Sequence, residues 1–455
     1  MTSELKPPKT KNNGEGSMQG YSMFQRFKLG AVSLSIGLLL SANSYADSWP
    51  LTEVGASAAG FSEDGIAKLD AAMNKIVADQ DVAGIVWILA KDGHVATYET
   101  AGLARVDDQT PMTKESLFRI YSMTKPVTGV ALMMLHEQGL WDFDDPISKF
   151  VPEFKDLKVM TSYNEAGDMV LEPVKNPPTM RQLLNHSAGF GYGLGGSDPV
   201  NEAFRNTQVL ASDDLDTLIE RVADIPLMFE PGEAWYYSVA VDIQGYIVQQ
   251  LSGMSFGEYL EENIFAPLDM TDTRFFVQPQ DQQRFAEVHN WDEERQRLVQ
   301  RPHRTDRPSY LDPDRLESGG GGLVSSTHDY ARFLQMLVNE GELDGAKLLT
   351  PESVRIMRTN SLRDELNLRG SPTSEGQPGQ GFGVDFAVIS DPKKANSPQG
   401  AGTYYWSGAA GTWFWIDPTE DMFLIGMIQA QGPTRPGAPN MRNVARDIIY
   451  ASLPQ

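Results

Sequence analysis

A serine three residues before a lysine is the feature of this sequence that could carry out chemistry. On a helix, residues at this spacing share one face, so the hydroxyl and the amine would lie one turn apart. A partly desolvated lysine near a tyrosine or a second cation can be neutral, and it could then take the serine proton. The spacing alone is a weak signal, because it occurs at Ser3, Ser122 and Ser390.

The surrounding sequence favours Ser122 as the nucleophile and Lys125 as its proton-handling partner. Ser122 follows an apolar segment, residues 117–121, and begins a predicted helix over residues 122–138 whose apolar positions would bury it. Pro126 is compatible with this helix, because the first turn has no helical acceptor for an N–H group. A capping serine with a surface lysine is the alternative interpretation.

Three other serines have competing motifs and a structural interpretation. Ser3 lies in a predicted leader, and Ser390 lies in a predicted turn with no helix following. Ser255 lies in a Gly-x-Ser-x-Gly motif, which in α/β-hydrolases requires a preceding strand, whereas here residues 242–251 predict a helix. With Glu258 three residues later, Ser255 predicts a helix-capping box instead.

A cluster of aromatic residues follows a Pro-Gly turn at residues 231–232 and precedes a helix predicted from Ala240. Tyrosines in such a place are usually packed in the core, and we expect this of Tyr236. For Tyr237 the residues alone do not decide between a packed core residue and a functional one.

Taken together, the motifs resemble the serine β-lactamase and penicillin-binding-protein superfamily, in particular class C β-lactamases and the family VIII carboxylesterases among them. The resemblance covers residues 60–452 in order and rests on residues 122–126, 144–147, 183–189, 231–238, 319–325 and 406–418. It implies that Ser122 is acylated and that Tyr237 shuttles a proton between nucleophile and leaving group.

Two departures from the β-lactamase pattern imply an ester substrate. Relatives carry Tyr-x-Asn as the second motif, and Val239 replaces the asparagine here, which implies an apolar wall where lactamases hold an amide. The third motif, Lys-Thr-Gly in lactamases, reads Trp406, Ser407 and Gly408, so the cation that attracts the drug carboxylate is missing. Both changes resemble the esterase branch.

The resemblance also implies a mechanism without a cofactor or a metal. Lys125 and Tyr237 would deprotonate Ser122 for attack on a small-molecule ester with a short acyl chain. The backbone N–H groups of Ser122 and Ala409 would form the oxyanion hole, and water would free the acid. A β-lactamase or D-alanyl peptidase is the enzymatic alternative, and a non-catalytic binding protein on the same fold is a second one.

The predicted elements indicate an α/β (α+β) fold with one antiparallel sheet built from both ends of the chain. A helix capped by Ser62 and a hairpin over residues 84–100 come first. Near the end, strands are predicted at residues 382–389, 404–406, 412–416 and 422–427, and a helix at 441–450. We expect a leader (1–46), an α/β domain (47–125 and 318–455) and a mostly helical domain (126–317), with the active site between the two domains.

Composition excludes several classes of function. The 455 residues are 41% apolar and 22% charged, an ordinary globular balance. A net charge of −23 argues against a nucleic-acid partner, because phosphate binding needs clustered lysine and arginine. The absence of cysteine excludes disulfides and a thiol nucleophile, and the six histidines lack the spacing of a zinc hydrolase.

The N-terminal residues resemble an export signal. Arg26 and Lys28 precede an apolar run over residues 29–40, and the small residues Ser44 and Ala46 suit cleavage after Ala46. A run of about twelve apolar residues is too short to span a bilayer. We therefore expect a periplasmic or secreted mature protein without a membrane span.

Overall fold

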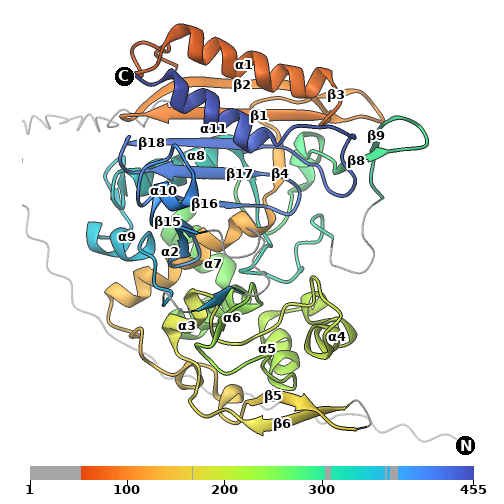
Figure 1. Cartoon of the computed structure of the whole chain (residues 1–455), viewed down its shortest axis with the longest axis vertical. Helices are drawn as coiled ribbons and strands as arrows, with labels where there is room; N and C mark the ends of the chain where they lie inside the picture. The colour runs from red at the N-terminus through yellow and green to blue at the C-terminus, as the bar shows by residue number, and fades with distance from the viewer. Residues whose placement is uncertain (1–52, 166–167, 303–308, 364–365, 369–377, 455) are drawn as a thin grey trace, which may run out of the picture. The chain divides into compact units, whose positions relative to one another are not determined.

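The framework of the fold is an eight-stranded antiparallel sheet (Figure 1). The structure is a computed structural model, and it describes residues 53–165, 168–302, 309–363, 366–368 and 378–454. The described residues belong to one compact unit, and the predicted leader lies outside them. Within these ranges, no helix is long and apolar enough to cross a membrane. The predicted division into two domains stays a prediction.

Both ends of the chain contribute strands to the sheet, as predicted. Its order is β14-β15-β16-β17-β18-β1-β2-β3. The early strands are β1 (Gly84–Lys91), β2 (His94–Arg105) and β3 (Thr110–Pro111), and the late ones are β14 (Gln380–Phe382), β15 (Ala387–Ile389), β16 (Tyr404–Ser407), β17 (Trp413–Asp417) and β18 (Met422–Met427). The two sets join where β1 pairs with β18. Nearly every residue of β1, β17 and β18 is buried, because helices cover both faces of the sheet.

One face of the sheet is covered by α1 (Glu63–Ala78) and α11 (Met441–Ser452), which lie together at the top of Figure 1. The predicted cap is confirmed, since the Ser62 side chain accepts a hydrogen bond from the Gly65 N–H. A Cβ atom on Gly65 would lie 2.0 Å from Ser452, so glycine permits this close packing of the two helices.

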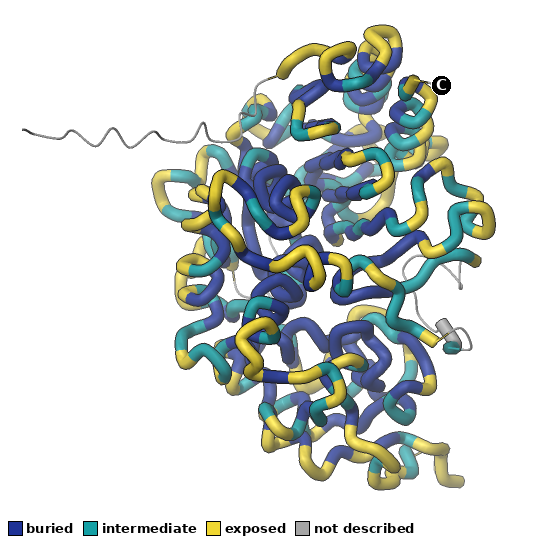
Figure 2. The backbone as a smooth tube through the Cα atoms, turned by 90° about the vertical axis from the view of Figure 1, so that its left-hand side faces the viewer, coloured by how far each residue is buried: buried dark blue, intermediate teal, exposed yellow. Residues whose placement is uncertain are grey.

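The opposite face packs on α8 (Thr327–Val338), and α2 (Thr124–Glu137) packs on α6 (Ala240–Ser252). Eleven of the fourteen residues of α2 are buried, which makes it a central helix. In Figure 2, buried backbone fills the centre of the described unit, and exposed segments lie at its rim. The remaining α-helices of the described ranges are α3 (Met180–Leu184), α4 (Pro199–Asn206), α5 (Leu215–Ala223), α7 (Phe256–Leu260), α9 (Pro351–Met357) and α10 (Pro392–Ala395).

The section predicted to be mostly helical also contains two β-hairpins. They are β5 (Lys158–Tyr163) with β6 (Met169–Pro173), and β8 (His289–Asp292) with β9 (Arg297–Gln300). The first lies far from the large sheet, at the bottom of Figure 1. Only Val159 is buried among its strand residues, so the hairpin lacks the apolar alternation by which a strand is recognised in a sequence.

Two predictions near the C-terminus were wrong in detail. Residues 382–389 form the end of β14 and all of β15 with a turn between them, rather than one strand, and Asp385 has a left-handed φ of 58°. Ser390 is followed by the short helix α10, because the Asp391 carboxylate accepts a hydrogen bond from the Lys394 N–H and caps the helix.

A stability prediction follows from the packing of the sheet against α1 and α11. Gly426 in β18 pairs with Trp413, and an added Cβ would lie 2.1 Å from the Trp413 ring. We expect Gly426→Ala to lower the free energy of unfolding by about 1–3 kcal/mol, because the packed ring has no room to move. Urea unfolding measures the change. Gly195→Ala is the control, since its new methyl group would meet no atom within 4 Å; equal stability of both variants would contradict the prediction.

Candidate active site

Ser122 lies in a sharp connection between a strand and the central helix. The strand β4 (Leu117–Arg119) leads into a 3₁₀ turn over Tyr121–Met123, and α2 begins at Thr124, two residues later than predicted. Tyr121 has a φ of 44°, a left-handed conformation that costs energy for a tyrosine and is found at functional sites. The serine is half-exposed, whereas the residues that follow it are buried.

Hydrogen bonds from distant segments hold this connection in place. The Ile120 N–H donates to the Leu323 carbonyl over 3.2 Å, and the Leu323 N–H donates to the Thr124 hydroxyl over 3.1 Å. The Tyr330 hydroxyl, on α8, donates to the Met123 carbonyl over 2.8 Å. The position of Ser122 therefore depends on residues two hundred positions later in the chain.

Lys125 lies one turn beyond Ser122 and is completely buried. Its Nζ donates to the Gly320 carbonyl over 2.6 Å, to the Tyr192 hydroxyl over 3.2 Å, and to Ser122 Oγ over 3.5 Å. An ammonium group has three N–H donors, so the site supplies one acceptor for each.

Glycines bring the Gly320 carbonyl to the lysine. A Cβ atom on Gly319 would lie 2.4 Å from the Val241 carbonyl, and one on Gly320 would lie 2.5 Å from the Asp242 carboxylate, so this segment can pass α6 only without side chains. The Ser318 hydroxyl and the Gly320 N–H both donate to buried Asp242. Asp242 thus fixes the segment and places a negative charge behind the lysine.

These neighbours favour the charged form of Lys125. Burial lowers the pKa of the ammonium, but Tyr192, Tyr237 and Asp242 together outweigh it and hold the pKa of Lys125 above its usual value. The sequence is compatible with a neutral lysine that takes the serine proton, but the three acceptors around Nζ favour an ammonium. Burial raises the pKa of Tyr192, so this phenol stays protonated while it accepts from the lysine.

Tyr237 lies immediately before α6 and packs against Lys125. The ammonium is 4.5 Å from the centre of the Tyr237 ring, and the phenol oxygen is buried. Four other rings surround it, those of His186, Tyr192, Trp406 and Trp235, at centroid distances of 5.0, 5.4, 5.4 and 6.4 Å. The fold thus brings Tyr237 to the Ser122 and Lys125 pair, where the resemblance places it.

The end of β16 lies against the nucleophile segment because Gly408 has no side chain. A Cβ atom there would lie 2.4 Å from the Ile120 carbonyl, two residues before Ser122. Trp406 is buried against Tyr237, Ser407 is half-exposed and Ala409 is exposed. In the described parts of the chain, the Ala409 N–H donates no backbone hydrogen bond, which suits the oxyanion-hole role implied for it.

Val239 does not lie where the sequence analysis placed it. Its side chain is 0% exposed and belongs to the core, so it forms no wall open to substrate. Its N–H donates to the Gly191 carbonyl over 3.0 Å, which ties the start of α6 to the loop that carries Tyr192. Trp235 and Trp413 are core residues, and Trp413 faces α1 and α11.

The competing motif at Ser255 is structural. Ser255 caps α7 and forms the predicted capping box with Glu258. Gly257 donates its N–H to the Glu317 carboxylate over 2.7 Å, and a Cβ atom there would lie 2.3 Å from that carboxylate. Ser255 and Gly257 therefore stabilise the start of α7 and do not form a nucleophile elbow.

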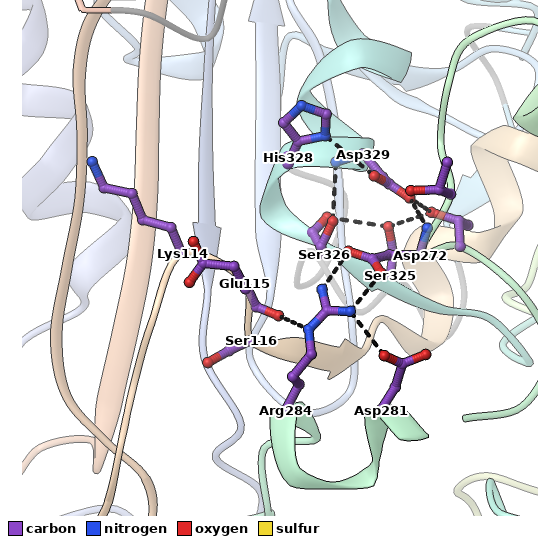
Figure 3. Close-up of polar contacts among 12 residues, drawn as sticks. Lys114, Glu115, Ser116, Asp272, Asp281, Arg284, Ser325, Ser326, His328 and Asp329 are labelled. Carbon is purple, nitrogen blue, oxygen red and sulfur yellow. Dashed lines mark hydrogen bonds and ion pairs between the residues drawn. The ribbon is translucent and has the colours of Figure 1, made fainter. Parts of the chain in front are cut away.

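A second group of serine, histidine and aspartate residues lies at the start of α8 (Figure 3). His328 Nδ1 is 3.3 Å from the Asp329 carboxylate, as in a hydrolase triad. However, Ser326 Oγ accepts from the Asp329 N–H, and Ser325 Oγ bonds with the Thr273 hydroxyl. Among the hydrogen bonds of the described residues, neither serine pairs with His328, so this cluster joins α8 to its neighbours rather than forming a triad.

Sequence reasoning missed three groups that contact or surround Lys125. They are Tyr192, the Gly320 carbonyl and Asp242, and they approach from different segments. The run of glycines at residues 319–322 was the available signal, because such a run marks close backbone approach. Tyr192 lies between glycines at positions 191 and 193, and no local pattern there indicates contact with a lysine.

Comparisons with known proteins agree with this geometry. A family model described as Beta-lactamase matches residues 69–447. An uncharacterized protein of Mycobacterium tuberculosis is 36% identical over 72% of this chain and 81% of its own length, and Esterase EstB of Burkholderia gladioli is 30% identical over 85% and 95%. The solved structure of EstCE1, a hydrolase with promiscuous acyltransferase activity, superimposes with a TM-score of 0.70 at 24% identity, over 85% of this chain and 99% of that one.

The contacts of Lys125 generate a prediction about Tyr192. Tyr192→Phe removes one acceptor from the buried ammonium, and a hydrogen bond to a charged group contributes about 1.5–3 kcal/mol. We expect a fluorophosphonate probe to label Ser122 about tenfold more slowly, because a misplaced ammonium assists the serine less well. Tyr259→Phe is the control, since its buried hydroxyl has no partner among the described residues. Equal labelling rates for the wild type and Tyr192→Phe would contradict the prediction.

Proposed function

Because the chain belongs to the beta-lactamase family, we propose that it is a carboxylesterase-type serine hydrolase that cleaves small-molecule esters through an acyl-enzyme on Ser122. The observation that carries this proposal is the meeting of a half-exposed serine, a buried ammonium and a buried phenol in one place. The B. gladioli relative is named an esterase, which supports the choice of substrate. Within the family we assign the chain to the branch similar to class C enzymes.

Because Lys125 is charged, it cannot accept the serine proton, and Tyr237 carries out the proton transfers instead. Tyr237 acts as a phenolate that the nearby ammonium stabilises, and it becomes the neutral phenol when it takes the proton of Ser122. Ser122 Oγ then attacks the ester carbonyl carbon, and the N–H groups of Ser122 and Ala409 hold the oxyanion. Collapse breaks the bond to the alcohol oxygen, which leaves with the proton from Tyr237. Water, deprotonated by the Tyr237 phenolate, attacks the acyl carbonyl carbon, and the bond to Ser122 Oγ then breaks. Ser122 takes the proton back from Tyr237, and the acid leaves.

The surroundings of the third motif favour an ester over a lactam that carries a carboxylate. Trp406 packs its ring on Tyr237 and Phe382, at 5.4 Å from each, and Ser407 and Gly408 follow. These three residues offer a hydroxyl and aromatic surface but no positive charge. A substrate carboxylate would therefore lose its hydration at this strand without gaining an ion pair.

Parallel turnover assays test the proposal with a short-chain p-nitrophenyl ester and with nitrocefin. We expect ester cleavage to dominate and Ser122→Ala to lower it by at least about a thousandfold, as loss of a nucleophile does in serine hydrolases. Ser255→Ala, at the helix cap, is the matched control and should keep wild-type turnover. Efficient nitrocefin cleavage would show that the protein is a β-lactamase rather than an esterase. Full activity of Ser122→Ala would contradict a mechanism through an acyl-enzyme on Ser122.

Export is a separate part of the proposal. The basic residues, the apolar run over residues 29–40 and the small residues at 44 and 46 support a cleaved signal peptide, with a periplasmic or secreted product. We expect N-terminal sequencing of the exported protein to begin at Asp47. Ala46→Arg should block this cleavage, because the signal peptidase requires a small residue at that position. Recovery of the uncleaved chain from the cytosol alone would contradict export.

A further inference from the structure

His186 is a buried histidine beside Tyr237 that takes no part in the proposed mechanism. It follows α3, is 1% exposed, and has a left-handed φ of 59°. Its ring lies 5.0 Å from the Tyr237 ring and 5.3 Å from that of Phe382. A residue held in this backbone conformation, with a polar ring in an apolar site, has to be maintained by specific contacts.

Those contacts lie on both sides of Tyr237 in the chain. The His186 carbonyl accepts a hydrogen bond from the Tyr236 N–H over 3.0 Å. Its Nδ1 accepts from the Ser238 N–H over 3.3 Å and lies 2.9 Å from the Ser238 hydroxyl. One residue thus fixes the backbone immediately before and immediately after the tyrosine.

The hydrogen-bond pattern also determines the form of the ring. A nitrogen that accepts from an N–H carries no proton, so the proton of neutral His186 is on Nε2. Burial, with the Lys125 charge as a second cause, lowers the pKa of His186 well below its usual value. The imidazole therefore stays neutral and keeps Nδ1 as an acceptor throughout the pH range in which an esterase would be assayed.

We propose that His186 is a positioning residue that holds the Tyr237 phenol in line with Lys125 and Ser122 by bonding to the peptide groups on either side of it. It touches neither substrate nor reacting atoms, and its effect passes through Tyr237. The proposal rests on the assignment of Tyr237 as the proton acceptor. A displacement of about 1 Å in such a group can cost about a hundredfold in rate.

Two substitutions separate the hydrogen bond from the packing of the ring. In His186→Asn, Oδ1 occupies the place of Nδ1 relative to the backbone, and asparagine tolerates a left-handed φ. In His186→Phe, the ring remains among its aromatic neighbours but the acceptor is lost. His136→Phe is the matched control. His136 also packs on aromatic rings, but its Nδ1 pairs with the Trp141 carbonyl at the C-terminal end of α2.

Steady-state kinetics with the p-nitrophenyl ester test the proposal on protein whose folding is verified by thermal unfolding. We expect His186→Phe to lower kcat about a hundredfold with KM nearly unchanged, because substrate binding is not affected. His186→Asn should restore kcat to within about tenfold of the wild type. If His186→Phe does not fold, His186→Leu, which also has no acceptor at the place of Nδ1, should show the same loss of kcat.

Other outcomes overturn the inference. A folded His186→Phe protein with wild-type kcat would show that the acceptor is not needed, and equal losses in the asparagine and phenylalanine variants would assign His186 to the core alone. If the wild type cleaves no ester, the proposed function fails separately, and the rate of fluorophosphonate labelling of Ser122 then replaces kcat. In that assay we expect His186→Phe to be labelled most slowly and His186→Asn at a rate closer to that of the wild type.

Discussion

The burial of one positive charge is the constraint on which this site depends. An ammonium inside a protein is tolerated only when acceptors and a negative charge replace its water. Lys125 obtains them from the Gly320 carbonyl, the Tyr192 and Ser122 hydroxyls and, at longer range, Asp242. The glycine segment, the loop before α4 and the start of α6 must all be in place before the lysine can be buried.

The sheet and α2 turn this constraint into a catalytic geometry. Ser122 lies on a strained turn held by Leu323 and Tyr330, and Gly408 lets the end of β16 approach within contact of the same turn. The nucleophile and the predicted oxyanion donors therefore lie directly beside the strands β4 and β16 and the helix α2. Rigid placement matters, because pre-oriented groups lower a barrier without reorganising during the reaction.

Aromatic packing sets the electrostatic character of the site. The phenol of Tyr237 is enclosed by the rings of His186, Tyr192 and Trp406, in surroundings of low polarity. An ammonium stabilises a phenolate far more strongly there than it does in water. Trp406, one of these rings, occupies the place of the third-motif lysine, which connects the packing of Tyr237 to the preference proposed for esters.

Local sequence patterns and the family motifs determined the sheet from both ends, the caps at Ser62 and Ser255, and the group of Ser122, Lys125 and Tyr237. These features depend on neighbours within a few residues or on motifs that the chain shares with relatives. The exposed β5 and β6 hairpin escaped prediction because it buries almost nothing, and Val239 was misplaced because an apolar residue suits a pocket and a core equally well.

Only the tertiary structure decided the charge of Lys125 and the role inferred for His186. The acceptors of the lysine lie 67 and 195 positions along the chain, and the partner of His186 lies 52 positions away. Whether a lysine is charged depends on the balance between lost hydration and the groups that replace it. No local pattern contains that balance, because folding alone brings the compensating groups together.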